Sequence, residues 1–107
     1  MASPDGSAVR VAVVQSSPVL FNKQKGLEKL AGEIRSLKGE KPSLILFPEA
    51  LVPGYPRHLG FGAKVGHRSE KGKDLFNRYY LNSLELPSED TDIISEAVRF
   101  TGAFTAV

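Results

Sequence analysis

The side chain with the clearest capacity for chemistry is Glu49, which follows the apolar run LILFP at residues 44–48. In α/β proteins the end of a buried strand is rigid and opens onto a crevice, so a carboxylate there can meet a substrate. Pro48 restricts the backbone before Glu49, and the flanking residues are apolar. We therefore expect the carboxylate to be partly desolvated and usable as a general base. The alternative is a solvated glutamate, or one that caps a helix.

The sequence lacks the residues or motifs that several other common kinds of site need. The chain of 107 residues has no cysteine, which excludes a disulfide framework and a thiolate metal site within it. His58 and His67 have no acidic or thiol cluster at ligand spacing, so we expect no metal. The serines at positions 16, 17 and 83 lack the glycine elbow of serine hydrolases, and glycines 60, 62 and 66 do not form a G-x-G-x-x-G loop. We expect no cofactor.

Composition and charge limit the kinds of partner that we expect the protein to bind. Residues 57–78 carry six Lys or Arg against two acids, but no nucleic-acid recognition motif accompanies them, and the net charge is only +2. We therefore expect a solvated basic loop and no nucleic-acid partner. The first ten residues do not resemble a secretory signal, and no apolar run approaches the ~18 residues of a membrane span. The sequence indicates a globular, cytoplasmic protein that does not contact a membrane.

The elements that must position Glu49 follow from the apolar pattern. Val9–Gln15 is short and β-branched with both faces apolar, as in a strand buried on both sides. Residues 23–38 have apolar side chains at helical spacing, with Asn22 as the cap. Charged residues, Lys29 and Glu33 among them, fall mostly elsewhere on the helical wheel.

Ser43–Phe47 is a second apolar strand, so this half of the chain is a βαβ unit with parallel strands. In the second half, residues 54–72 are interpreted as a long loop and Asp74–Leu84 as a helix. Thr91 or Asp92 is expected to cap a further helix that ends at Gly102. Residues 103–107 resemble the first residues of a third strand.

This pattern predicts a disordered leader over residues 1–8 and a partial domain over residues 9–107 that is truncated within a strand. Right-handed crossovers would place all the helices on one side of the sheet, and nothing in the sequence is available to cover the other side. We therefore expect an exposed apolar sheet face, which favours association.

Several motifs in this order resemble the nitrilase branch of the carbon–nitrogen hydrolase superfamily. The strand VRVAVVQ, an amphipathic helix and the strand LILFPEA come first. They are followed by GYPR at residues 54–57, Phe61-Gly62, Gly66 with Arg68, Lys71-Gly72-Lys73, Phe76 with Tyr79-Tyr80, and Leu86-Pro87. The resemblance covers nearly the whole chain from Val9 onward. It implies an α/β fold, the N-terminal βαβαβ portion of a nitrilase-like four-layer αββα sandwich.

The resemblance also implies a reaction, the hydrolysis of a small-molecule nitrile to a carboxylic acid and ammonia. In that family a cysteine thiolate attacks the nitrile carbon to give a thioimidate, and a glutamate and a lysine assist. Glu49 matches the glutamate, whereas the lysine and cysteine motifs lie beyond the segment that this chain resembles. The chain alone is therefore expected to be inactive. Tyr55 would lie near the substrate pocket, or would pack its ring against the strand ends.

Family members associate, so the resemblance implies a homo-oligomer formed through full-length subunits. The alternative to an enzymatic role is a non-catalytic truncated isoform that associates with full-length nitrilase subunits or modulates them. A free-standing βαβ binding module is a third interpretation.

Overall fold

The structure is a computed structural model, and it describes residues 7–54 and 70–107. Three parallel strands form a sheet in the order β1-β2-β3, with bounds Val11–Val13, Leu44–Leu46 and Phe104–Ala106. Three α-helices are described, α1 (Lys23–Ser36), α2 (Glu70–Leu81) and α3 (Glu89–Thr101), and a short 3₁₀ turn, η1 (Lys38–Glu40), follows α1. The predicted α/β class and parallel pairing are confirmed.

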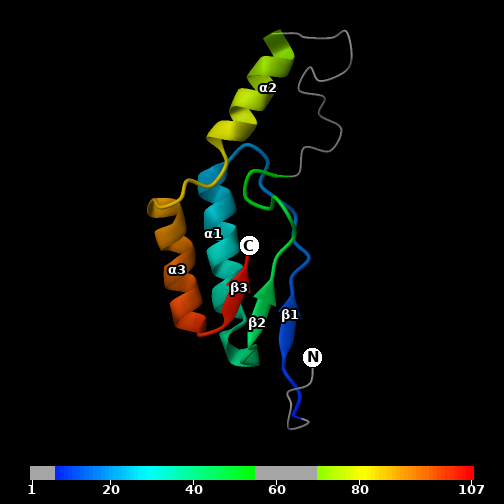
Figure 1. Ribbon diagram of the computed structural model, residues 1–107, viewed down its shortest axis with the longest axis vertical. Helices are drawn as coiled ribbons and strands as arrows, with labels where there is room; N and C mark the ends of the chain where they lie inside the picture. The colour runs from blue at the N-terminus through cyan, green and yellow to red at the C-terminus, as the bar shows by residue number, and fades with distance from the viewer. Residues whose placement is uncertain (1–6, 55–69) are drawn as a thin grey trace.

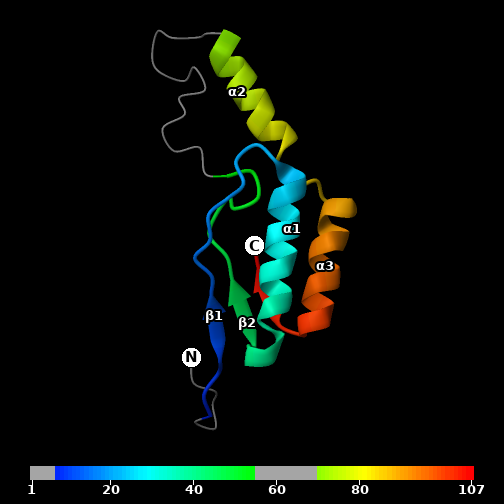
Figure 2. The same ribbon diagram turned by 180° about the vertical axis from the view of Figure 1, so that it is seen from behind.

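Helices α1 and α3 lie side by side against one face of the sheet, and α2 extends beyond this body (Figure 1 and Figure 2). The core lies between α1, α3 and the sheet, where it is formed by buried apolar side chains: Leu27, Leu30, Ala31, Ile34, Ile45, Leu51, Val52, Ala97 and Ala103. The Thr101 hydroxyl donates to the carbonyl of Ile34 at 3.0 Å, which links α3 to α1 across this core. Burial of the apolar stripe of α1 accounts for its predicted amphipathic pattern.

The opposite face of the sheet is not covered by the described residues. The register aligns Val11, Leu44 and Phe104 in one row and Val13, Leu46 and Ala106 in another, while Ala12, Ile45 and Thr105 alternate with them toward the helices. Val13 is 70% exposed and Phe104 is 83% exposed, whereas Ile45 is fully buried. The expectation that the first strand is buried on both sides is therefore wrong. The expectation of an exposed sheet face is confirmed for the described residues.

The helix ends differ from the prediction at four places, and two of them are C-terminal ends: α1 ends at Ser36 rather than Lys38, and α2 ends at Leu81 rather than Leu84. Ser88, rather than Thr91 or Asp92, caps α3: its side chain accepts from the backbone N–H of Asp90, and Thr91 bonds back to the Ser88 N–H. Helix α2 begins at Glu70, four residues before the predicted start. The other predicted caps, Asn22 before α1 and Gly102 after α3 with φ of 79°, are confirmed.

Residues 1–6 of the expected leader and most of the expected long loop lie outside the described residues. In the ranges 7–54 and 70–107, no helix is long and apolar enough to cross a bilayer.

Candidate functional site

Glu49 lies just past the carboxyl end of β2, as the sequence predicts. Backbone pairing continues beyond the strands at this edge, because the N–H of Phe47 donates to Ala106 and that of Val14 donates to Leu46. The carboxyl ends of the three parallel strands therefore lie at one edge of the sheet (Figure 1), and Glu49 follows β2 at that edge. The side chain itself is exposed, so the expected partial desolvation is wrong for the residues described. The carboxylate is therefore accessible to a molecule outside the chain.

The backbone around Glu49 makes a turn, residues 49–54, and one residue of this turn has a φ angle that L-residues rarely adopt. Ala50 has φ of 53°, in the left-handed region that glycine normally occupies. The turn closes with a 2.9 Å hydrogen bond from the N–H of Gly54 to the carbonyl of Ala50. Strain of this kind is found at functional sites more often than elsewhere. Sequence reasoning missed it, because alanine carries no signal for a positive φ.

The 49–54 turn is seated firmly on the core. Leu51 and Val52 are buried at 9% and 2% exposure. Gly26 of α1 lets the turn come close, since a Cβ at Gly26 would lie 3.3 Å from the Val52 carbonyl oxygen. Gly54, with φ of 88°, approaches the chain before α1, since a Cβ there would lie 2.7 Å from Leu20 Cδ1. A Cβ at Gly26 would press on the Val52 backbone, whereas at Gly54 the positive φ itself favours glycine.

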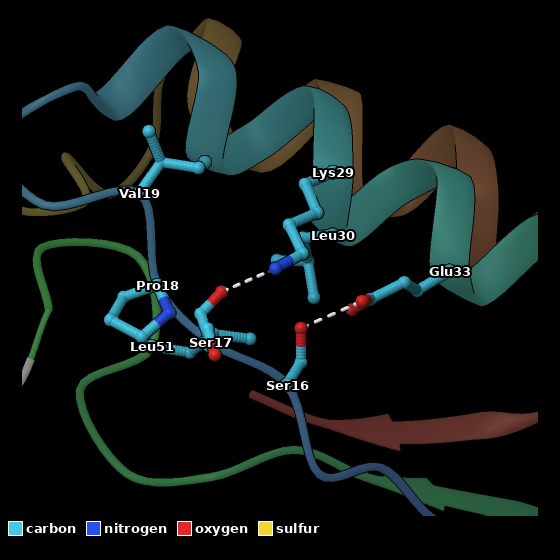
Figure 3. A pocket seen from close by; sticks show the side chains of 9 residues that line it. Ser16, Ser17, Pro18, Val19, Lys29, Leu30, Glu33 and Leu51 are labelled. Carbon is cyan, nitrogen blue, oxygen red and sulfur yellow. Dashed lines mark hydrogen bonds between the residues drawn. The ribbon is translucent and has the colours of Figure 1, made fainter.

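The β1–α1 loop, residues 16–21, is held to α1 by two polar contacts (Figure 3). The Ser16 hydroxyl donates to Glu33 Oε1 at 2.7 Å, and Lys29 Nζ donates to the Ser17 carbonyl at 2.6 Å. Glu33 and Lys29 thus border the packed side of α1, although the helical wheel places them mostly away from it. Sequence reasoning considered Ser16 only as a nucleophile. The contact between Ser16 and Glu33 could not be predicted, because a serine after a strand and a glutamate on a helix are both common in sequences.

The loop, α1 and Leu51 together surround a hollow (Figure 3). It is too narrow to hold a water molecule. The Glu33 Oε2 oxygen is buried and has no hydrogen-bond partner among the described residues. The hollow is therefore a packing feature beside the 49–54 turn and not a substrate pocket.

A second polar cluster joins the first turns of α1 and α3. Lys23 Nζ lies 2.9 Å from Asp90 Oδ2, with side-chain exposures of 28% and 12%. The hydrogen bond from Lys23 holds the pKa of Asp90 below its ordinary value of 3.8, against the opposing effect of burial, and the N–H of Glu85 also donates to this carboxylate. Because its amine is paired in this way, Lys23 has a structural role.

The other predicted site residue, Tyr55, lies outside the described residues, as do Arg57, His58, His67 and Arg68. Of the two predicted site residues, the structure therefore describes Glu49. Within the described part of the chain, no three His, Cys, Asp or Glu residues gather as a metal site would require. The described site is an exposed carboxylate on the 49–54 turn, and the chain has no thiol to serve as a nucleophile.

Comparison with known protein families identifies the class of protein to which this chain belongs. Residues 10–105 match the carbon–nitrogen hydrolase family, and the chain belongs to that family. The parallel sheet with helices on one face agrees with the predicted N-terminal α/β portion of the nitrilase fold. Two of the four expected layers, one sheet and one helix layer, lie within the described residues.

Individual relatives point to the nitrilase branch. The chain is 37% identical over 90 residues to nitrilase 3 of Arabidopsis thaliana, covering 84% of this chain and 26% of that protein. It is 34% identical over 98 residues to nitrilase blr3397 of Bradyrhizobium diazoefficiens, covering 92% and 30%. It is also 33% identical over 84 residues to the bifunctional nitrilase/nitrile hydratase NIT4B of Nicotiana tabacum, covering 78% and 24%. The chain thus spans 24–30% of the length of these relatives.

Proposed function

We propose that these residues supply the general base of a nitrilase, an enzyme that converts a nitrile and two molecules of water into a carboxylic acid and ammonia. The base is Glu49. The observation that carries the proposal is its position: an exposed carboxylate on a strained turn at the carboxyl edge of a parallel sheet, in a chain of the carbon–nitrogen hydrolase family. The relatives named nitrilase support the substrate class.

The proposed chemistry needs a thiol from outside these 107 residues, because the chain has no cysteine. Glu49 would take the thiol proton, and the thiolate would attack the nitrile carbon to give a thioimidate. Water would add to the thioimidate carbon and ammonia would leave, giving a thioester. A second water would release the acid and restore the thiol. Glu49 would return protons to nitrogen and remove them from each water. We also propose that Tyr55, six residues after Glu49, lines the substrate pocket.

The first experiment is the intact mass of the native protein, captured from its source with an antibody to residues 1–40. A species much heavier than 11.6 kDa is expected, and it should release ammonia from nitriles. In that protein Glu49→Gln should lower kcat by about 10²-fold or more, since the general base is lost. Glu40→Gln, an exposed acid at the opposite end of β2, is the matched control. Full activity in Glu49→Gln, or nitrile hydrolysis at enzymatic rates by the purified 107-residue chain, would refute the proposal.

A second candidate function is association with longer nitrilase subunits, and the exposed sheet face favours it. Val13 and Phe104 are large apolar side chains on a face that the described residues leave open. Mixing the 107-residue chain with catalytically active subunits should change their sedimentation or their rate of nitrile hydrolysis. Unchanged sedimentation together with unchanged rates at excess fragment would exclude this role.

A further inference from the structure

We infer that Glu33 is a positioning residue for the candidate site: its carboxylate anchors the β1–α1 loop against the turn that carries Glu49. The inference rests on the proposed function of Glu49. It does not make Glu33 a catalytic residue, because the described hydrogen bond of its side chain goes to Ser16 of the loop and not to Glu49.

The first step is the nature of the anchor. Glu33 Oε1 accepts from the Ser16 hydroxyl at 2.7 Å, the usual distance of a well-formed O–H···O hydrogen bond. Glu33 Oε2 is buried without a partner among the described residues, so within that part of the chain the carboxylate is held through Ser16. A half-buried carboxylate beside Leu30 and Leu51 is costly to desolvate, and an apolar residue would fill the position more cheaply. This cost indicates that the glutamate serves to hold Ser16.

The second step is the path from Ser16 to Glu49. Two residues after Ser16, Pro18 backs the 49–54 turn: a Cβ on Gly54 would lie 3.5 Å from Pro18 Cβ. The N–H of Gly54 in turn closes on the carbonyl of Ala50, the neighbour of Glu49. Figure 3 shows Ser16, Pro18 and Leu51 around one hollow, with Glu33 reaching in from α1. Releasing Ser16 should therefore loosen the loop and, through Gly54, the turn.

Amide hydrogen exchange of the 107-residue chain, followed by NMR, tests the inference. The local reporter is the N–H of Gly54, and the distant reporter is the N–H of Phe104, which bonds to the Ser43 carbonyl at the other end of the sheet. Glu33→Ala should speed exchange at Gly54 about tenfold and at Phe104 less than about twofold, because one charge-assisted bond is lost locally. Ser16→Ala should reproduce this pattern, which keeps the test available if Glu33→Ala does not fold.

Rescue distinguishes positioning from general support of the fold. Glu33→Gln retains an acceptor for the Ser16 hydroxyl, so most of the protection at Gly54 should return. Glu28→Ala, which removes an exposed acid on the same helix, should leave both amides unchanged.

Equal acceleration at both amides, or no acceleration at Gly54, would overturn the inference. The measurement involves no nitrile turnover, so its failure leaves the role of Glu49 untouched. Conversely, an active Glu49→Gln enzyme would remove the proposed function while the structural link from Glu33 to the turn still held.

Discussion

Lys23 and Asp90 form an ion pair at 2.9 Å that links the first turn of α1 to the first turn of α3. The two helices cover the same face of the sheet, so this pair fixes their relative position at one end. The backbone N–H of Lys23 also donates to Asn82 Oδ1 at 2.9 Å, which brings the residue after α2 to the same point. Three helices are therefore joined by polar contacts at the start of α1.

Replacing Asp90 with asparagine should destabilise the chain. The new amide oxygen can still accept from the N–H of Glu85, but the neutral side chain cannot form an ion pair with the Lys23 ammonium, which is only 28% exposed. We expect a loss of roughly 1–3 kcal/mol in the free energy of unfolding, as for hydrogen bonds to charged groups, measured by urea denaturation. Glu89→Gln, at an exposed neighbour on the same turn, is the control and should change little. An unaltered denaturation midpoint in Asp90→Asn would contradict a stabilising role for the pair.

The Lys23–Asp90 pair also predicts that part of the folding stability is lost at acidic pH. The pKa of Asp90 is lower in the folded chain than its ordinary value of 3.8, chiefly because Lys23 donates to it. A depressed pKa means that the unfolded chain binds the proton first, so this stabilisation is present above pH 3.8 and is lost as pH falls through the folded pKa. Denaturation midpoints measured from pH 6 down to about pH 2 should therefore fall less steeply in Asp90→Asn than in the parent chain. Parallel pH curves for the two proteins would show that Lys23 does not perturb Asp90.

Two glycines of α1 should respond in different ways to alanine. At Gly32 a Cβ meets nothing within 4 Å, so Gly32→Ala should raise stability by up to about 1 kcal/mol through helix propensity. At Gly26 a Cβ would lie 3.3 Å from the Val52 carbonyl oxygen, so the 49–54 turn must shift. Gly26→Ala should therefore gain less than Gly32→Ala or lose stability, and thermal unfolding of the two variants gives the comparison. Equal gains would mean that α1 and the turn are not in close contact.

Gly54→Ala should cost roughly 1–2 kcal/mol, because φ of 88° is strained for any residue with a Cβ. The clash with Leu20 adds little, since the Leu20 side chain is 49% exposed and can rotate. Gly39→Ala, where a Cβ meets nothing within 4 Å, is the control. Chemical denaturation measures the difference, and a stable Gly54→Ala variant would argue against the left-handed turn.

The open sheet face should drive self-association of the isolated chain. Phe104→Lys places a charge on an edge strand whose aromatic ring is 83% exposed, so it should reduce association without a large change in stability. Leu86→Lys, which removes a 73% exposed leucine in the connection between α2 and α3, is the matched control. Sedimentation at rising concentration gives the result. Equal behaviour of the two variants would mean that association does not involve the sheet face.

The regular elements could be predicted from the sequence because each has a local cause. Apolar runs indicated β2 and its parallel partner, helical spacing indicated α1, and Asn22 and Gly102 marked helix ends through well-understood capping. The start of α3 was predicted wrongly because Thr91 is part of the cap without being the N-cap: it bonds back to Ser88 in a capping box that has Thr in place of the usual Glu or Gln.

The position of Glu49 was also predictable, since it depends only on where β2 ends. Its surroundings were not, because they depend on contacts between segments far apart in the chain. The bond from Ser16 to Glu33 spans 17 residues, and the left-handed Ala50 stands directly before the buried Leu51 and Val52. Neither has a signature in composition or periodicity.

The 49–54 turn fixes the backbone position of Glu49 but not the environment of its side chain. The buried neighbours of the turn fix where the main chain of this acid sits, while its side chain remains in water. The chain thus determines where the backbone of Glu49 lies, and the surroundings of the carboxylate are left to whatever binds over this exposed edge of the turn.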